Sequence, residues 1–189
     1  MFQKLLSFIF LVNQVLGRIL AQVGARFKLA RLRHQGALIG KNVELRGHCI
    51  ITLERGGFLE IGDDVVIDQG AELIIHSGGR LLIGARVYIG KRDLISVKTQ
   101  VTIGDHCIFA HQVTIIDSHH SYDDYQTPIR DQKETSHPIH ISQNVWLGTG
   151  VVIVKGIELG DHTVVGANSV VTHSFGPRAV IGGVPAHCI

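Results

Sequence analysis

Aliphatic residues recur at every sixth position over the C-terminal third of the chain, and glycine directly follows several of them. A period of six fits neither a helix, whose period is 3.6, nor an alternating strand, whose period is 2. It predicts a coil in which each hexapeptide forms one flat side, with the aliphatic side chain inside and a small residue at the corner. Three sides close a triangular coil, and the coils stack as parallel strands. The aliphatic positions are Ile141, Leu147, Ile153, Leu159, Val165 and Val171.

The same motif occurs earlier, as IGKNV at 39, IGDDVVIDQGA at 61, IGARVYIG at 83 and IGDHCIFAHQV at 103. Its register runs through 103, 109 and 115 and resumes only at 141, a gap of 141 − 115 = 26 residues, or four hexads plus two. We therefore predict that the chain leaves the coil in one long loop, at about 116–140. Loops that project from a rigid scaffold commonly carry function.

Residues 1–36 follow a helical period instead, with apolar positions from Phe2 to Val23. The longest pure apolar run, 8–12, is too short to span a bilayer. Two interpretations fit equally well: an amphipathic helix on an anionic membrane surface, or a helix packed on the body or in an oligomer. A cleaved signal peptide fits less well, because Asn13, Gln14 and Arg18 break the apolar stretch early. The expected organisation is an arm over 1–36 and a β-helix domain over 37–189.

Composition and charge support this division. The 189 residues are 45% hydrophobic and 18% charged, which excludes a disordered or low-complexity chain. Residues 1–43 contain seven Lys/Arg and no acid, and the remainder has 11 Lys/Arg against 16 Asp/Glu, or 11 − 16 = −5. A basic arm on an acidic body suggests a separate partner for the arm. Cys49, Cys107 and Cys188 are far apart and odd in number, which favours free thiols over a disulfide framework or a zinc site.

The predicted loop opens with the polar stretch IIDSHHSYDD, residues 115–124. A histidine beside acids suits a general base, because its pKa lies near working pH and a carboxylate can orient its ring. The sequence contains neither a Walker-type phosphate loop nor a GxSxG elbow. None of the three cysteines lies in the loop, which argues against a covalent acyl-enzyme.

The stretch VTIIDSHHSYDD, followed by PIHISQNVWLGTGVVIVKGIELGDHTVVGANSVVTHS and IGGVPA, resembles the hexapeptide-repeat O-acetyltransferases, in the branch of galactoside, maltose and colanic-acid acetyltransferases. The resemblance covers roughly residues 80–189. It implies an all-β fold, a left-handed parallel β-helix, although the general rule for crossovers favours the right hand. It also implies transfer of an acetyl group from acetyl-CoA to a saccharide hydroxyl, without a metal, in homotrimers whose active sites lie between subunits. The basic, apolar arm would place such an enzyme beside lipid-linked glycans, so the acceptor we expect is a bacterial surface polysaccharide or its lipid-linked precursor.

The resemblance assigns roles to individual residues. The family's catalytic base, seven residues after the Val of VTI, matches His120. On the donor side, Trp146 matches the aromatic residue along the pantetheine arm, and Thr149 matches the small residue near the thioester carbonyl. Backbone amides near Gly148 and Thr149 are candidates for holding the oxyanion. The positions that line the CoA tunnel match Ala167 and Thr172.

On the acceptor side we expect contacts from Lys98, Asp117 and His119. In galactoside-type members an Asn and an Asp contact the sugar, and the matching places here hold Gly90 and Lys98. The acceptor is therefore not expected to be a simple galactoside, and Lys98 suggests an acidic sugar. Positions where relatives carry a base near the CoA phosphates hold His173 and His187 here.

Two other functions remain open. A γ-class carbonic-anhydrase-like hydratase uses the same β-helix with zinc-binding histidines, and His106 and His111 have a suggestive spacing, although a third ligand is unclear. A non-catalytic β-helix scaffold is the other alternative. For the acetyltransferase we expect a cytoplasmic location, peripheral at the inner face of the cytoplasmic membrane through residues 1–25, and no nucleic-acid partner.

Overall fold

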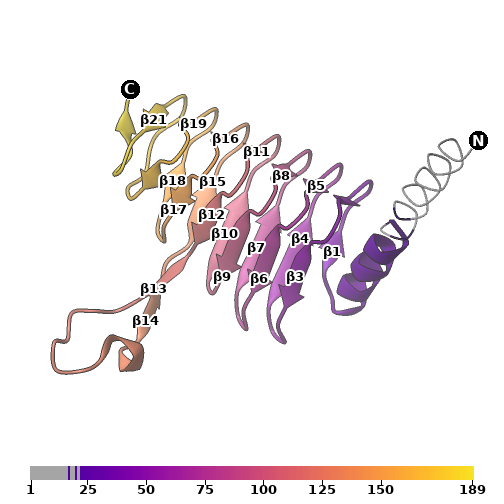
Figure 1. The fold of residues 1–189 in the computed structure, drawn as a ribbon, viewed down its shortest axis with the longest axis horizontal. Helices are drawn as coiled ribbons and strands as arrows, with labels where there is room; N and C mark the ends of the chain where they lie inside the picture. Colours follow the sequence, from indigo (N-terminus) through magenta and orange to yellow (C-terminus); the bar gives the residue numbers. More distant parts are fainter. Residues whose placement is uncertain (1–16, 18–19, 21) are drawn as a thin grey trace, which may run out of the picture.

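The computed structural model describes residue 17, residue 20 and residues 22–189. They form a three-sided parallel β-helix with a helix at its N-terminal end and a hairpin that projects from its side (Figure 1). The predicted all-β fold is confirmed. Most of the apolar period predicted from Phe2 to Val23 lies outside the described residues.

Three sheets, here called A, B and C in chain order, form the sides of the β-helix. Sheet A contains β1 (Leu38–Ile39), β4 (Phe58–Ile61), β7 (Arg80–Ile83), β10 (Gln100–Ile103), β15 (Ile139–Ile141) and β18 (Glu158–Leu159). Sheet B contains β2 (Glu44–Leu45), β5 (Val66–Ile67), β8 (Tyr88–Ile89), β11 (Ile108–Phe109), β16 (Trp146–Leu147), β19 (Val164–Val165), β21 (Val180–Gly182) and β22 (His187–Cys188). Sheet C contains β3 (Ile50–Leu53), β6 (Glu72–Ile75), β9 (Leu94–Val97), β12 (Thr114–Ile116), β17 (Val152–Ile153) and β20 (Val170–Val171).

The core is a stack of aliphatic ladders, because each sheet places equivalent residues of successive coils side by side. In sheet A one ladder runs through Ile61, Ile83, Ile103, Ile141 and Leu159, all buried. The predicted inward positions of the hexad, from Ile141 to Val171, are all buried as well. Burial of these aliphatic side chains is the main force that holds coils with such short strands together.

Two of the three corners turn through a single residue with a left-handed backbone, a conformation that is uncommon outside glycine. At the corner between sheets A and B, φ lies between 53° and 63° at Asn42, Asp64, Arg86, His106, Asn144, His162 and Arg178. At the corner between B and C the corresponding residues are Gly70, Arg92, Gln112, Gly150 and Asn168. These corners are compact, so neighbouring coils stack with little space between them.

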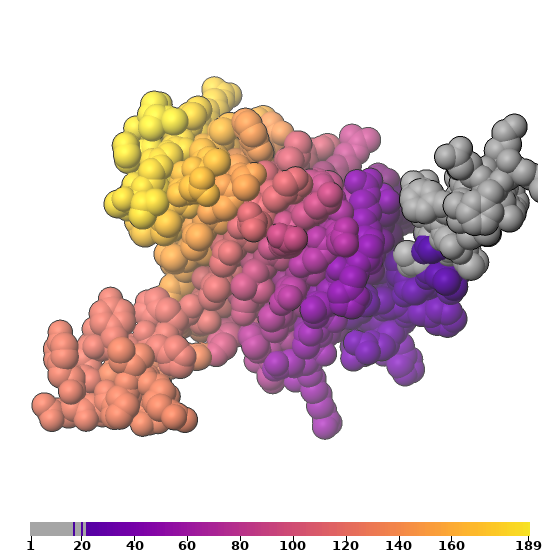
Figure 2. Space-filling view, in the orientation of Figure 1, coloured from indigo at the N-terminus to yellow at the C-terminus, as the bar shows by residue number. Residues whose placement is uncertain are grey.

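The third corner, between sheets C and A, takes up every insertion in the β-helix. Inward-facing residues on consecutive A, B and C sides are six apart, as in Ile61, Ile67 and Leu73. From sheet C back to sheet A the spacing is instead ten at Leu73 to Ile83 and 26 at Ile115 to Ile141. The longest insertion forms the hairpin of β13 (Ser118–His120) and β14 (Glu134–Ser136), with a short 3₁₀ helix at Ile129–Asp131. Figure 2 shows this segment as a lobe that stands out from the body.

The N-terminal helix, over 22–34, covers the end of the first coil. Leu29 and Leu32 are buried against that coil, whereas Leu20, Val23 and Phe27 are exposed. One side of the helix is thus a packing surface and another side is apolar and exposed. No helix within the described part of the chain is long and apolar enough to cross a bilayer.

Candidate active site

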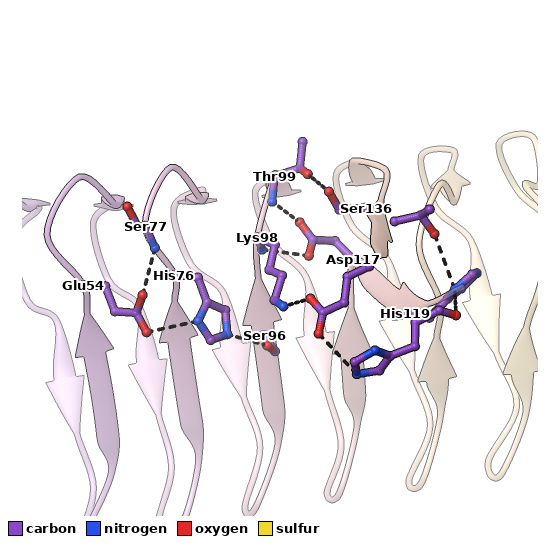
Figure 3. A network of polar contacts seen from close by, with 12 residues as sticks. Glu54, His76, Ser77, Ser96, Lys98, Thr99, Asp117, His119 and Ser136 are labelled. Atoms are coloured by element: carbon purple, nitrogen blue, oxygen red, sulfur yellow. Dashed lines mark hydrogen bonds and ion pairs between the residues drawn. The ribbon is translucent and has the colours of Figure 1, made fainter. Parts of the chain in front are cut away.

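Asp117 fixes the base of the hairpin (Figure 3). Its side chain is fully buried, and its carboxylate accepts the backbone N–H groups of Lys98 at 2.8 Å and Thr99 at 2.7 Å. On the returning strand, the Thr99 hydroxyl donates to Ser136 Oγ at 2.6 Å. The hairpin is therefore tied to the preceding coil at both of its ends. A buried carboxylate whose two oxygens accept backbone N–H groups positions the chain. The acceptor contact expected at Asp117 therefore does not agree with the hydrogen bonds and burial of this side chain.

The hairpin register gives His120 a carboxylate partner. His120 lies opposite Glu134 and His119 lies opposite Thr135, and neighbouring residues of a strand point to opposite faces. His120 Nε2 is 3.3 Å from Glu134 Oε1. When Nε2–H donates to this carboxylate, Nδ1 is left with a lone pair that can accept a proton. The His120 side chain is 51% exposed, so an acceptor has access to it.

Lys98 binds the other oxygen of the same carboxylate, Glu134 Oε2. The three side chains thus form a chain, Lys98 to Glu134 to His120, that joins the preceding coil to both strands of the hairpin. The ammonium group is already paired with an anion. The suggestion that Lys98 selects an acidic sugar therefore loses its support.

His119 lies on the opposite face of the hairpin from His120. Its Nδ1 donates to the backbone carbonyl of His120 at 2.9 Å, and its ring leans against Tyr122 with 6.1 Å between the ring centroids. These contacts stay within the hairpin. They fit a loop-shaping side chain better than a second base.

The C–A corner carries a further polar cluster that the sequence reading missed. His76 lies between Glu54, at 3.1 Å from Nδ1, and Ser96 Oγ, at 3.4 Å from Nε2 (Figure 3). The backbone N–H of Ser77 and the His76 side chain lower the pKa of Glu54, so this carboxylate is charged at neutral pH. Residues 54, 76 and 98 are each 22 apart, which is the offset between paired residues of β3, β6 and β9, and this spacing was the available signal that one corner collects them.

The predicted donor residues lie elsewhere on the β-helix. Trp146, on the outer face of sheet B, is 53% exposed and stacks in register with Ile108 and Val164. Gly148 and Thr149 follow it at the B–C corner. A Cβ at position 148 would lie 2.7 Å from the backbone nitrogen of Ala167, so only glycine allows the two coils to approach this closely.

Within one chain, the predicted donor residues lie far from His120. Thr149 precedes β17, whereas the hairpin follows β12, the strand paired with β17. One hexapeptide side separates the two corners, roughly 20 Å at about 3.3 Å per residue. Ala167 shares the B–C corner with Thr149, because Asn168 N–H donates to the Thr149 carbonyl at 2.8 Å. Thr172 follows β20 at the C–A corner and so lies on the His120 side.

The histidines considered for a metal do not converge. His106 is at the A–B corner and His111 is at the B–C corner, on either side of β11. In the part of the chain that the structure describes, no three His, Cys, Asp or Glu side chains are grouped to hold a metal ion. Cys49 and Cys107 are buried, and burial raises the pKa of the Cys107 thiol to about 11; Cys188 is exposed.

Comparison with known proteins identifies the family. The model of the bacterial transferase hexapeptide family, with its six repeats, matches residues 138–173. An Escherichia coli protein named as a colanic acid biosynthesis acetyltransferase is 32% identical over 169 residues, which cover 87% of this chain and 75% of that protein. The chain belongs to the hexapeptide-repeat transferase family. Its β-helix is the left-handed one of these acetyltransferases.

Two further matches show how far the similarity to known proteins extends. A Mycobacterium tuberculosis protein named as an acetyltransferase is 30% identical over 168 residues, and this hexapeptide-repeat chain spans only 54% of its length. Among solved structures, a mutant of AntD, an N-acyltransferase from Bacillus cereus in complex with dTDP-4-amino-4,6-dideoxyglucose and coenzyme A, superposes with a TM-score of 0.71 at 20% identity. The match covers 85% of this chain and 87% of that one. At this identity the structural likeness concerns the fold.

Proposed function

We propose that this protein transfers an acetyl group from acetyl-CoA to a hydroxyl group of a saccharide, with His120 as the general base. The observation that carries the proposal is the pairing of a half-exposed His120 with Glu134, on a hairpin that Asp117 holds over the C–A corner. Glu134 orients the ring and stabilises the imidazolium that forms during the reaction. Lys98 in turn holds the carboxylate in place.

The reaction is a direct transfer. His120 Nδ1 takes the proton of the acceptor hydroxyl as that oxygen bonds to the thioester carbonyl carbon. The carbon–sulfur bond breaks, the acetyl group stays on the acceptor oxygen, and the proton passes from His120 to the departing CoA sulfur. The backbone N–H groups beside Gly148 and Thr149 are the candidates for holding the carbonyl oxygen. No side chain is acylated in this scheme.

The donor is assigned to the B–C corner of the β-helix. The exposed face of Trp146 offers an apolar contact for the pantetheine arm, and Thr149 and Ala167 continue the same corner towards the C-terminus. Two relatives lend support: AntD was solved with coenzyme A and a nucleotide sugar, and the E. coli relative is named for colanic acid biosynthesis. A polysaccharide or its lipid-linked precursor is accordingly the acceptor class that we favour.

The separation of the two corners supports a site that is shared with a neighbouring subunit. A cyclic trimer with its axis parallel to the β-helices would bring the B–C corner of one chain to the C–A corner of the next, and so Thr149 to His120. We therefore propose a homotrimer with three shared sites.

The helix over 22–34 is the proposed membrane contact. Its exposed residues Val23 and Phe27 are flanked by Arg26 and Arg31, an arrangement that suits an anionic lipid surface. Contact there would keep the enzyme beside lipid-linked acceptors. This contact is independent of the chemistry at His120.

The test is a screen of acetyl transfer onto nucleotide sugars, lipid-linked sugars and whole polysaccharide, read as CoA release together with the acetyl mass increment on the acceptor. Each acceptor is run with wild type and His120→Ala. In parallel, acetyl-CoA should change the fluorescence of Trp146, the only tryptophan of the chain. CoA release without an acetylated acceptor would indicate a hydrolase, and unchanged fluorescence at saturating donor would move the donor away from Trp146.

A further inference from the structure

A basic hollow lies at the B–C corner, towards the N-terminus from Thr149. It has a volume of about 460 Å³ and is lined by Gln69, Gly70, Lys91, Arg92, His111 and Gln112. Its lining contains two permanent cations, a histidine and two amides, and no carboxylate. Among the described residues no carboxylate lies within ion-pair distance of Lys91 or Arg92. The nearby Asp68 carboxylate is already occupied by the Tyr88 hydroxyl at 2.7 Å and the Gln69 N–H at 2.7 Å.

The backbone at this corner positions these groups. Arg92 and Gln112 occupy the left-handed corner positions, with φ of 59° and 60°. Gly70 leaves space for Arg92, since a Cβ there would lie 3.1 Å from Arg92 Cγ. The backbone N–H of Lys91 donates to His111 Nδ1 at 3.4 Å, so a neutral His111 carries its proton on Nε2 and remains a donor. The hollow therefore presents N–H donors on an arginine, a lysine and an imidazole, a combination suited to an oxyanion.

The position of the hollow indicates which reactant it serves. It adjoins the donor corner, because Gly150 N–H donates to the His111 carbonyl at 2.9 Å. From Thr149 the assigned donor residues continue towards the C-terminal coils, and the hollow continues in the opposite direction. In the proposed trimer it would face the C–A corner of the neighbouring chain in the coils that precede His120, where Lys98 and His76 lie. That is the acceptor side of the shared site.

We propose that this hollow binds the phosphate or carboxylate of an anionic saccharide acceptor. The inference rests on the proposed function and narrows its substrate to acidic or phosphorylated sugars. The selecting cations are Lys91 and Arg92, which have no carboxylate partner, and not Lys98, which Glu134 neutralises. Acetylation would then favour an acceptor that spans from the anion hollow of one subunit to His120 of the next.

The first experiment is a calorimetric titration of the full-length protein with inorganic pyrophosphate at fixed ionic strength. Wild type should bind, and the double variant Lys91→Gln/Arg92→Gln should bind about 10- to 100-fold more weakly, the usual effect of losing charge-assisted hydrogen bonds. Arg86→Gln is the matched control, because Arg86 is an exposed arginine with the same left-handed backbone at the A–B corner. No binding to wild type, or equal weakening by Arg86→Gln, overturns the site.

The second experiment separates the two sources of an anion. The KM values for galactose 1-phosphate, galacturonate and galactose are compared in wild type and in the double variant. We expect a lower KM for the charged sugars in wild type, a loss of that advantage in the double variant, and an unchanged KM for acetyl-CoA. If the double variant instead weakens binding of CoA but not of pantetheine, the hollow holds the donor's phosphates and the acceptor assignment is wrong. If no sugar is acetylated while pyrophosphate binding still depends on Lys91 and Arg92, the acetyl transfer proposal fails and the anion site stands.

Discussion

His120 and Glu134 face each other across the hairpin, with 3.3 Å between Nε2 and Oε1, and Lys98 binds the second oxygen of the same carboxylate. The pair joins two adjacent strands that the chain connects by a long excursion, and Asp117 anchors that excursion to the coil beneath. The proposed base, His120, is thus oriented by a side chain that comes from the far end of its own loop.

Replacement of His120 is expected to remove the general base with little effect on the fold. A general base contributes about 10²–10⁴-fold, so His120→Ala should lose transfer by that factor. Its side chain is half exposed, so the melting temperature should stay close to that of wild type. Glu134→Gln should lower kcat more than KM, because it removes the orienting charge and leaves the acceptor contacts. His119→Ala is the matched control, and a larger loss there than in His120→Ala would reassign the base.

A shared site predicts complementation between inactive subunits. His120→Ala alters the C–A corner, and Thr149→Trp blocks the exposed B–C corner without entering the core. In each mixed trimer of the two variants, about one site in three should regain activity, namely the site where an intact His120 meets an intact Thr149 of the neighbour. Differently tagged chains, purified on both tags in sequence, provide the mixed trimers. If both corners acted within one chain, every site would carry a defect and the mixture would remain inactive.

Asp117 should matter for stability and for loop position. Asp117→Ala removes a buried acceptor and leaves the part-buried N–H groups of Lys98 and Thr99 without their partner, at a cost of roughly 2–5 kcal/mol. Chemical denaturation should show this loss, and the hairpin should become more sensitive to limited proteolysis between β13 and β14. Asp123→Ala, at an exposed site in the same loop, is the control and should change neither quantity. Equal stability of the two variants would contradict the anchoring role.

Much of this architecture could be predicted from the sequence because each hexapeptide forms one side of a coil. Each aliphatic position from Ile141 to Val171 is an inward side chain, and the break after Ile115 is where the hairpin leaves the coil. The earlier coils were harder to recognise, since the insertions at 54–57 and 76–79 interrupt the period at the C–A corner.

The contacts of the site could not be predicted in the same way. Pairing of His120 with Glu134 depends on the hairpin register, which no repeat specifies. The separation of Thr149 from His120 depends on the corner of the β-helix at which each residue lies, and a short sequence motif does not identify that corner. Position 90 shows the same limit: a Cβ there would lie 1.4 Å from the Ala110 carbonyl oxygen, so this backbone does not accommodate the Asn that the family resemblance leads one to look for.

Asp93 should make stability depend on pH. This carboxyl is buried and accepts N–H groups from Gly90 and Val113. Desolvation raises its pKa from 3.8 to about 7. Between these two values the folded protein holds a proton that the unfolded chain has lost, so stability falls as the pH rises. The contribution is fully present below pH 3.8 and lost by about pH 7, on the order of 4 kcal/mol in total. Because other groups titrate as well, the measurement is the difference in denaturation free energy between wild type and Asp93→Asn at several pH values. A difference that does not change with pH would mean that Asp93 is already ionised when buried.

The last prediction concerns the N-terminal helix. Residues 1–43 carry seven basic side chains and no acid, and Val23 and Phe27 are exposed on the helix instead of packing on the coil. Full-length protein should therefore co-sediment with anionic vesicles more than with neutral ones, with about 1 kcal/mol from each Lys or Arg near the surface, reduced by salt. Val23→Ser/Phe27→Ser should weaken this binding without affecting assembly, because neither side chain contributes to the buried contacts of Leu29 and Leu32. Tyr125→Ser, at a 95% exposed site on the hairpin, is the control.

Deletion of residues 1–25 should release the enzyme from vesicles and leave acetylation of a soluble acceptor intact, since His120 and Trp146 lie outside the deleted segment. If full-length protein ignores anionic vesicles, or if the truncated chain no longer assembles, the helix is a packing element and the membrane-proximal acceptor loses its support.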